Sequence, residues 1–422
     1  MIKKEWIPFF SYYHKENIMK LIERASYMDF LQRNRERPII KVVSGVRRCG
    51  KSTLFSLYQH HLLQDGVTEE QIHVINFENL EFEDLQEYHA LYRYVCERLV
   101  PGKWNYVFLD EIQHVPQFEK AVDSLFIKEK VDIYITGSNA YFMSSDLATL
   151  LSGRYVELRM LPLSFREFCS RERLQEAFSL RELYEKYTRE SSFPYAMQLD
   201  GREKDINEYM QGIYSTILLK DIVARLRIAD AKMLESVTKY LFLHVGSLLS
   251  PKKIADSMTS VGRKIDAKTV ERYLQGLQDG LLVYQADRFN LVGKEVLRIN
   301  SKYYVVDAAM RFFLIGRKGQ DTGHVLENIV YLELLRRGYR VYVGALPSGE
   351  VDFVAQNERG HVYIQVAEST QQPEVLEREL KSLRSIKDNY PKYLLTLDEV
   401  NATADYDGIK KRNVLRWLLE KE

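Results

Sequence analysis

Short apolar runs alternate with helical patterns along the first third of the chain. The apolar runs occupy residues 39–43, 72–77, 105–109 and 131–136. Behind the first run, apolar side chains recur at helical spacing, at Leu54, Leu57, Tyr58 and Leu62. Buried strands that alternate with amphipathic helices are typical of an α/β domain, so we predict a parallel sheet covered by helices.

The middle of the chain has a different pattern. Residues 166–240 are helical in pattern, which suits a small lid followed by a connecting helix. Two further helices are predicted over 250–258 and 266–274, and strands over 280–284 and 303–307. Helix, turn, helix and then a hairpin is the outline of a winged helix-turn-helix.

Length, charge and cysteine content narrow the class of protein. The 422 residues suit several domains, and a net charge of +1 gives no global attraction to nucleic acid or membrane. The three cysteines, Cys49, Cys96 and Cys169, are scattered and odd in number, which fits a reducing cytoplasm. No apolar run approaches the length of a membrane span, and residues 1–6 lack a signal-peptide pattern. We therefore predict a cytoplasmic location and no membrane partner.

Residues 45–52 match the phosphate-binding loop G-x-x-x-x-G-K-[ST]. The loop lies between a predicted strand and a predicted helix, so its N–H groups and the positive helix end point to one place. That geometry suits a triphosphate, and we predict that ATP binds there with Mg²⁺. The predicted binding residues are Gly45, Val46, Arg47, Arg48, Cys49, Gly50, Lys51, Ser52 and Thr53. Lys51 would contact the β- and γ-phosphates, and the Ser52 hydroxyl would bind Mg²⁺.

Two acidic residues follow the apolar run 105–109 directly. Asp110 and Glu111 would lie at the carboxyl end of a buried strand, where ligands bind in open α/β sheets. We predict that Asp110 holds the Mg²⁺, usually through a water. Glu111 would orient and polarise the water that attacks the γ-phosphate.

Two further positions are candidates for contacts to the γ-phosphate or the attacking water, and each has a second, structural interpretation. Asn139, or failing it Ser138, would hydrogen-bond the attacking water or the γ-phosphate, although both residue types also favour helix N-caps. Arg154 follows Gly153, and an arginine can stabilise the charge that develops in phosphoryl transfer, in cis or from a neighbouring subunit. The alternative for Arg154 is a surface salt bridge.

Several of these segments occur in one order together with the phosphate loop: 109–113, 135–139, 151–154 and 161–168. In this order they resemble a widespread prokaryotic family of AAA+-type ATPases with an uncharacterised C-terminal domain, over nearly the entire chain. The resemblance implies that Arg154 stands at the arginine-sensor or arginine-finger position of the family. One departure is the segment 191–194, where Ser191 and Ser192 replace the paired glycines that many relatives have before a proline.

The last third resembles the restriction-endonuclease-like PD-(D/E)xK fold. A helix is predicted over 324–331, a strand over 340–343, a turn at 347–349 and strands over 350–355 and 361–367. In that fold, an acid and then a (D/E)-x-K motif on the next strand hold Mg²⁺ and a water for phosphodiester cleavage.

The residues for that cleavage are incomplete. Asp352 is present and Glu327 lies on the predicted helix, but Gln365 stands at the expected acid and Ala367 at the expected lysine. A neutral amide is a poor Mg²⁺ ligand, and alanine can neither orient a water nor neutralise a phosphate. We therefore predict a nuclease-like part without metal-dependent cleavage, in which Glu327 and Asp352 are relics or support the fold.

The patterns together predict an α/β protein in five parts. These are a helical lead-in (1–36), a phosphate-loop AAA+-like ATPase core (37–165), a helical lid and connector (166–232), a winged helix-turn-helix (233–310) and a nuclease-like α/β domain (311–422).

Three hypotheses for function follow. The first is a Mg²⁺-dependent ATPase whose nucleotide state repositions the winged-helix and nuclease-like parts, with a protein partner and an oligomer as candidates. The second is an ATP-driven loader or remodeller of DNA, in mobile-element or defence biology. Its candidate phosphate contacts are Lys252, Lys253, Arg263, Lys264, Lys268 and Arg272, although interspersed acids dilute their field. The third is a scaffold that binds ATP without turnover.

Overall fold

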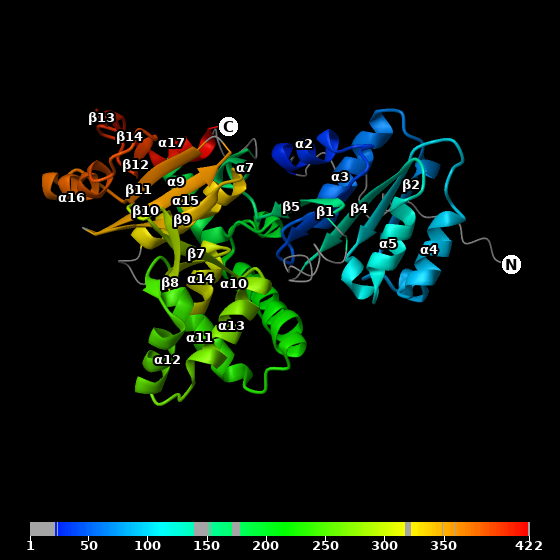
Figure 1. Cartoon of the computed structure of the whole chain (residues 1–422), viewed down its shortest axis with the longest axis horizontal. Coiled ribbons are helices and arrows are strands. Elements are labelled where there is room, and N and C mark those ends of the chain that lie inside the picture. The colour runs from blue at the N-terminus through cyan, green and yellow to red at the C-terminus, as the bar shows by residue number, and fades with distance from the viewer. Residues whose placement is uncertain are drawn as a thin grey trace. The chain divides into compact units, whose positions relative to one another are not determined.

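The structure, a computed structural model, describes residues 22, 24–138, 151, 153–170, 178–316, 322–347, 349–358 and 360–420. The chain divides into two compact units, Met1–Met160 and Leu161–Glu422, and each unit is built around its own sheet (Figure 1). The predicted mixed α/β fold with a parallel sheet is confirmed.

The first unit contains a five-stranded parallel sheet of order β2-β3-β4-β1-β5. Its strands are β1 (Ile40–Gly45), β2 (Ile72–Asn76), β3 (Asn105–Asp110), β4 (Val131–Gly137) and β5 (Tyr155–Met160). The first four are the strands that the apolar runs predict, whereas the half-exposed β5 was not predicted. Because all five strands run the same way, their carboxyl ends meet along one edge.

Helices cover both faces of this sheet (Figure 1). They are α2 (Ala25–Arg33), α3 (Lys51–Gln64), α4 (Tyr88–Cys96) and α5 (Phe118–Phe126), with short 3-10 helices at Glu69–Gln71, Leu80–Leu85 and Ile112–His114. Val107 and Leu109 of β3 are buried in the core that α4 and α5 close. Phe108 lies between them on the other face, where its ring is 5.1 Å from Phe55 of α3 and stacks on Tyr134 of β4 at 4.7 Å. Alternate side chains of one strand therefore anchor both helical layers.

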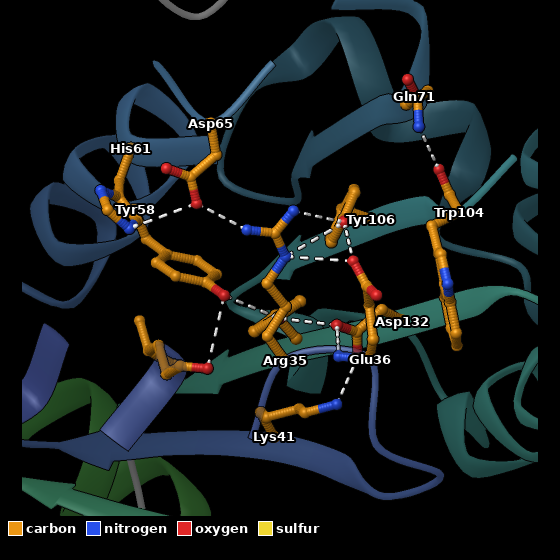
Figure 2. Close-up of polar contacts among 12 residues, drawn as sticks. Arg35, Glu36, Lys41, Tyr58, His61, Asp65, Gln71, Trp104, Tyr106 and Asp132 are labelled. Atoms are coloured by element: carbon orange, nitrogen blue, oxygen red, sulfur yellow. Dashed lines mark hydrogen bonds and ion pairs between the residues drawn. The ribbon is translucent and has the colours of Figure 1, made fainter. Parts of the chain in front are cut away.

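A buried polar cluster lies at the amino ends of the strands (Figure 2). Lys41 of β1 and Asp132 of β4 form an ion pair with no exposed side-chain surface. Asp132 also accepts hydrogen bonds from the Tyr134 hydroxyl at 2.7 Å and the Glu36 N–H at 2.8 Å, and Lys41 donates to the Arg37 carbonyl at 3.1 Å. Burial lowers the pKa of Lys41 and raises that of Asp132, although each charge favours the other. The cluster fastens the chain before β1 to the sheet.

Arg35 extends this cluster to the end of α3. Its guanidinium contacts the carboxylate of Asp65 at 2.7 Å and donates to the Tyr106 hydroxyl of β3 at 3.2 Å (Figure 2). The amino edge of the sheet is thus held by charged and hydroxyl groups, whereas the carboxyl edge carries the loops with the predicted chemistry.

The second unit contains a nine-stranded sheet of order β13-β14-β12-β11-β10-β9-β7-β8-β6. Its strands are β6 (Leu248–Leu249), β7 (Val283–Asn290), β8 (Glu295–Val305), β9 (Arg340–Leu346), β10 (Gly349–Asn357), β11 (Gly360–Ala367), β12 (Lys392–Thr396), β13 (Ala404–Tyr406) and β14 (Ile409–Asn413). The hairpin β7–β8 and the strands β9–β11 are joined because β7 pairs in parallel with β9. The regions predicted as a winged helix-turn-helix and as a nuclease-like domain therefore share one sheet.

The helices of the second unit begin with α7 (Phe165–Cys169), α9 (Leu180–Glu190), a 3-10 helix (Pro194–Gln198), α10 (Glu203–Thr216) and a π-helix (Ile217–Ala224). They continue with α11 (Ala231–Leu243), α12 (Pro251–Ser260), α13 (Ala267–Asp279), α14 (Ala308–Ile315), α15 (Thr322–Arg336), α16 (Pro373–Arg384) and α17 (Val414–Leu419). In the part of the chain that the structure describes, no helix is both long and apolar enough to traverse a bilayer.

The two serines at the departure from the family pattern bind one carboxylate. Ser191 has a φ of 86°, in the region that favours glycine. The hydroxyls of Ser191 and Ser192 donate to Asp307 at 3.1 and 2.6 Å, and the Ser192 N–H donates to it at 2.7 Å. Asp307 also caps α14 through the Met310 N–H at 2.7 Å. The segment after α9 is thereby tied to the end of the β7–β8 hairpin.

The pair of Lys41 and Asp132 generates a prediction about stability. Replacing Asp132 by Ala leaves an uncompensated buried ammonium, so we expect the first unit to lose about 3–5 kcal/mol of stability. The double variant Lys41→Met/Asp132→Leu should recover most of that loss, because apolar side chains can fill the same volume. Native-state hydrogen exchange of the β1 and β4 amides measures the effect within the full chain. Equal protection in Asp132→Ala and the wild type would contradict it.

Candidate nucleotide site

The phosphate loop connects the end of β1 to the start of α3. Gly45 is the last residue of β1, and a Cβ there would lie 2.4 Å from the carbonyl oxygen of Met160 on the neighbouring β5. Gly50 directly precedes α3 with a φ of 102°, which favours glycine. Both motif glycines are therefore required by the backbone, one by close approach and one by conformation. The loop delivers the N-terminus of α3 to the carboxyl edge of the sheet.

Lys51 is the first residue of α3, and its ammonium lies among oxygen atoms from three elements. It donates to the Gly45 carbonyl at 3.0 Å and to the Ser138 hydroxyl at 2.7 Å, and it lies 3.4 Å from the Glu111 carboxylate. Burial alone would lower the pKa of Lys51, but the electrostatic interactions of its neighbours, above all with the Glu111 carboxylate, outweigh burial and raise that pKa. The lysine is therefore a fixed positive charge at this edge.

Asp110 is the last residue of β3 and is 4 % exposed. The Thr136 hydroxyl of β4 donates a hydrogen bond to it, and the Ser52 hydroxyl forms a second one. Burial and the neighbouring Glu111 raise the pKa of Asp110, while the two hydroxyls and Lys51 oppose that rise. The predicted Mg²⁺ residues Ser52 and Asp110 are thus brought into contact, and both offer the oxygen atoms that Mg²⁺ prefers.

Glu111 has a left-handed backbone conformation, with a φ of 55° and a ψ of 47°. Its N–H donates to the Thr136 hydroxyl at 2.9 Å, and its carboxylate accepts hydrogen bonds from Ser138 and Gln113. Burial alone would raise the pKa of Glu111, but Lys51 and these donors lower it. Glu111 is therefore held as a carboxylate, in the kind of sparsely populated backbone conformation that clusters at functional sites.

The end of β4 supplies the bridging hydroxyl. Ser138 accepts from Lys51 and donates to Glu111, which makes a chain from ammonium to hydroxyl to carboxylate. Asn139, the first choice for the sensor residue, lies outside the described residues. Ser138, the second choice, is 2 % exposed and lies in the site.

Arg154 lies at the opposite edge of the sheet from the phosphate loop. Its carbonyl accepts a hydrogen bond from the N–H of Ile40, the first residue of β1, at 2.9 Å. From there β1 runs five residues to Gly45, about 16 Å at a strand's rise of about 3.3 Å per residue. The exposed guanidinium lies 5.8 Å from the Phe126 ring, and its charge opposes the rise that burial causes in the pKa of Asp123. Lys51, Asp110 and Glu111 of one chain are brought together, but Arg154 of that chain is not.

Two residues of the site were missed from sequence. Thr136 bridges Asp110 and the Glu111 N–H, and Gln113 orients the Glu111 carboxylate. The available signal for Thr136 was a hydroxyl at the end of an apolar strand, and for Gln113 an amide two residues after the acid. Neither signal identifies the residue that will be contacted. For Thr136, that residue is Asp110 on the adjacent strand, which the local sequence does not reveal.

In the nuclease-like part, Asp352 and Gln365 form hydrogen bonds to each other and to neighbouring protein groups. Gln365 accepts from the Asp352 N–H at 3.2 Å and donates to Glu379 at 2.9 Å, and the Val366 N–H donates to Asp352 at 2.9 Å. Ala367 ends β11. Across the described ranges, no group of three or more histidine, cysteine, aspartate or glutamate side chains is arranged to hold a metal ion.

Comparisons with known proteins identify the class of the first unit. Residues 37–169 match the family described as an AAA domain, and residues 181–321 match a domain of unknown function (DUF8612). A Walker-type ATPase of Pyrococcus abyssi has the same fold with a TM-score of 0.51 at 17 % identity, over 71 % of this chain and 97 % of that one. The first unit is therefore a nucleotide-binding domain of the AAA ATPase class.

The particular family follows from two relatives. The chain is 39 % identical over 402 residues to an uncharacterized protein of Haemophilus influenzae. This match covers 95 % of this chain and 99 % of that protein. It is 30 % identical over 429 residues to the uncharacterized protein MJ1544 of Methanocaldococcus jannaschii, over 95 % of this chain and 91 % of that protein. The chain belongs to the family that these two proteins represent.

The close approach at Gly45 generates a prediction about binding. A methyl group in Gly45→Ala would collide with the Met160 carbonyl and displace the loop, so we expect the affinity for Mg·ATP to fall at least tenfold, about 1.4 kcal/mol. Gly212→Ala is the matched control, because its added Cβ meets nothing within 4 Å in α10. A calorimetric titration measures both variants. Wild-type affinity in Gly45→Ala would contradict the tight approach of β5 to the loop.

Proposed function

We propose that the protein is a Mg²⁺-dependent ATPase whose nucleotide state repositions the C-terminal unit. The observation that carries this proposal is the convergence of Lys51, Ser52, Asp110 and Glu111 at one edge of a parallel sheet. A cluster that only stabilises the fold would require no more than paired opposite charges. This cluster also includes a phosphate loop, oxygen ligands suited to Mg²⁺ and a carboxylate that is kept ionised.

Each residue has a defined role in this mechanism. The N–H groups of the phosphate loop and the Lys51 ammonium would bind the β- and γ-phosphates, and Ser52 and Asp110 would hold Mg²⁺. Bound Mg·ATP supplies an electrophilic γ-phosphorus and a leaving group. Glu111 would accept a hydrogen bond from the attacking water and orient it for in-line attack.

The contact between Lys51 and Glu111 suggests how binding prepares the base. The ammonium lies 3.4 Å from the carboxylate and is shared with Ser138. Phosphate oxygens beside Lys51 would compete for that ammonium and free the Glu111 carboxylate for a water. Binding and activation of the base are then linked through one lysine.

The C-terminal unit is the part of the protein that we propose is moved when the nucleotide state changes. Since β7 pairs with β9, the winged-helix and nuclease-like parts within 233–310 and 311–422 would move as one body. The lid and connector region, 166–232, lies between these parts and the ATPase core in the sequence and is the proposed place of coupling. A protein partner and an oligomer remain the proposed contexts of this movement.

DNA is the second candidate ligand, through the proposed winged helix of α11, β6, α12, α13, β7 and β8. Several of its basic side chains already bind the chain itself. Arg272 donates to the Leu226 carbonyl, Arg263 to the Ser236 hydroxyl, and Lys253 to the Leu248 carbonyl at 3.2 Å. The other predicted phosphate contacts, Lys252, Lys264 and Lys268, are exposed. Because half of the basic set already binds the chain itself, we favour the first hypothesis over DNA binding.

Glu111 provides the direct test of turnover. We expect Glu111→Gln to retain Mg·ATP binding and to lower the hydrolysis rate about 10²- to 10⁴-fold, because the amide cannot accept the proton. Steady-state phosphate release and a binding titration measure the two effects, and Glu97→Gln, which changes an exposed acid of the same unit, is the control. Wild-type release in Glu111→Gln would contradict the role. Wild-type release no higher than that of Lys51→Ala would leave a scaffold that binds ATP.

Arg154 provides a test of assembly. Because it lies at the far edge of its own sheet, we propose that it acts on the ATP of a neighbouring copy, and Arg154→Ala should lower hydrolysis by about 10³-fold or more. Mixing Arg154→Ala with Lys51→Ala should restore part of the activity, since an intact loop can then meet an intact arginine. Arg159→Ala, at an exposed position of β5, should have no effect. An unchanged rate in Arg154→Ala, or no recovery in a mixed oligomer, would contradict this role.

A further inference from the structure

A lysine from the β7–β8 hairpin lies among the acids of the nuclease-like part. The Lys302 ammonium of β8 is 3.0 Å from Glu327 of α15, 2.6 Å from Glu350 and 3.5 Å from Asp352, both of β10. Its side chain is 5 % exposed, and those of Glu327 and Asp352 are 10 and 12 % exposed. Three carboxylate oxygens from two elements therefore surround one nitrogen atom.

The surrounding groups fix this arrangement. The Tyr304 hydroxyl, two residues along β8, donates to the same Glu327 oxygen at 2.6 Å, and His324 lies 3.8 Å from the other oxygen. Burial alone would lower the pKa of Lys302, but the three carboxylates outweigh it and raise that pKa. Lys302 is therefore a permanent positive charge whose geometry is set by the sheet.

We propose that the Lys302 ammonium occupies a latent divalent-cation site and keeps it closed, so that the nuclease-like part is held by a built-in cation in place of a metal. The three carboxylate oxygens lie 2.6, 3.0 and 3.5 Å from the Lys302 nitrogen, and in this arrangement they do not form a metal site, but all three lie around one point. Shortening the distances to the 2.0–2.6 Å of Mg²⁺ or Ca²⁺ ligands requires side-chain shifts of about an ångström. With the ammonium at that point, no metal ion can share it.

The three carboxylates do not share the ammonium equally. Glu350 is 32 % exposed and screened by solvent, whereas Glu327 and Asp352 are buried beside Lys302. Each of these two buried carboxylates has a further hydrogen-bond donor, the Tyr304 hydroxyl at 2.6 Å for Glu327 and the Val366 N–H at 2.9 Å for Asp352. One monovalent cation and these donors therefore face two buried carboxylates.

The same lysine also joins two parts of the unit. Lys302 belongs to the strand that follows the proposed winged helix, whereas its partners lie on α15 and β10 of the nuclease-like part. A bound metal would hold only the acids of the nuclease-like part, but Lys302 is covalently part of the hairpin. The substitution therefore exchanges a dissociable ion for a permanent link between the two.

The test measures Mn²⁺ binding to the full chain without nucleotide, by electron paramagnetic resonance of free Mn²⁺. We expect Lys302→Ala to bind one more equivalent of Mn²⁺ than the wild type, with a Kd of about 10⁻⁴–10⁻³ M. The double variant Lys302→Ala/Asp352→Asn should lose that equivalent, which separates it from metal bound near Asp110. Wild-type stoichiometry in folded Lys302→Ala would overturn the proposal.

Lys411→Ala is the matched control. Lys411 of β14 is another buried lysine of the same sheet, 2.9 Å from Asp398, and its removal should add no Mn²⁺ site because one carboxylate faces it. An extra equivalent in Lys411→Ala would show that any unpaired buried acid suffices, and would overturn the proposal. If Lys302→Ala is recovered unfolded, refolding with and without Mn²⁺ replaces the titration. Recovery that depends on Mn²⁺ supports the latent site, and equal failure in both conditions rejects it.

Discussion

The parallel direction of five strands is the constraint on which the nucleotide site depends. It brings the ends of β1, β3 and β4 to one edge, and the strand order inserts β4 between the other two. Lys51 and Glu111 are therefore bridged by the hydroxyl of Ser138, directly after β4. Thr136 of β4 bonds both Asp110, the last residue of β3, and the N–H of Glu111, which follows it. The opposite edge carries Lys41 and Asp132, which tie β1 to β4. Any change that shifts β4 would therefore disturb both edges.

The sequence revealed those parts of the first unit in which local pattern and global fold agree. Strands β1, β3 and β4 are buried on both faces and appear in the sequence as apolar runs, and the phosphate loop is a contiguous motif. Strand β5 was missed because it is half exposed and contains Glu157 and Arg159 among its apolar residues. Such a mixed pattern does not distinguish a strand at the edge of a sheet from a loop. The sequence also left open whether Arg154 acts in its own chain or in a neighbouring one, because the position of Arg154 is set by the pairing of β5 with β1.

The second unit shows a different limit of sequence reasoning. The absence of an acid at Gln365 and of a lysine at Ala367 could be seen from sequence, because both positions lie in one strand. The compensating Lys302 could not be seen, because it precedes Glu327 by 25 residues and belongs to a hairpin assigned to another domain. The parallel pairing of β7 with β9 is likewise non-local, and it places strands from both sides of the predicted boundary at residue 310 in one sheet. The sheet of the second unit and the surroundings of Lys302 are thus set by contacts between elements that are distant in the sequence, which local patterns do not reveal.

The Lys302 ammonium, as a permanent cation, would make the second unit independent of the Mg²⁺ that the first unit binds. In the proposed mechanism, Ser52 and Asp110 of the first unit would hold the Mg²⁺ of bound Mg·ATP. If the second unit also held Mg²⁺ through Glu327 and Asp352, its rigidity would vary with the same ion. An ammonium on β8 removes that dependence, because Lys302 cannot dissociate and its pKa is raised. The second unit would then keep one shape through the ATP cycle, as a body that is to be moved without deforming requires.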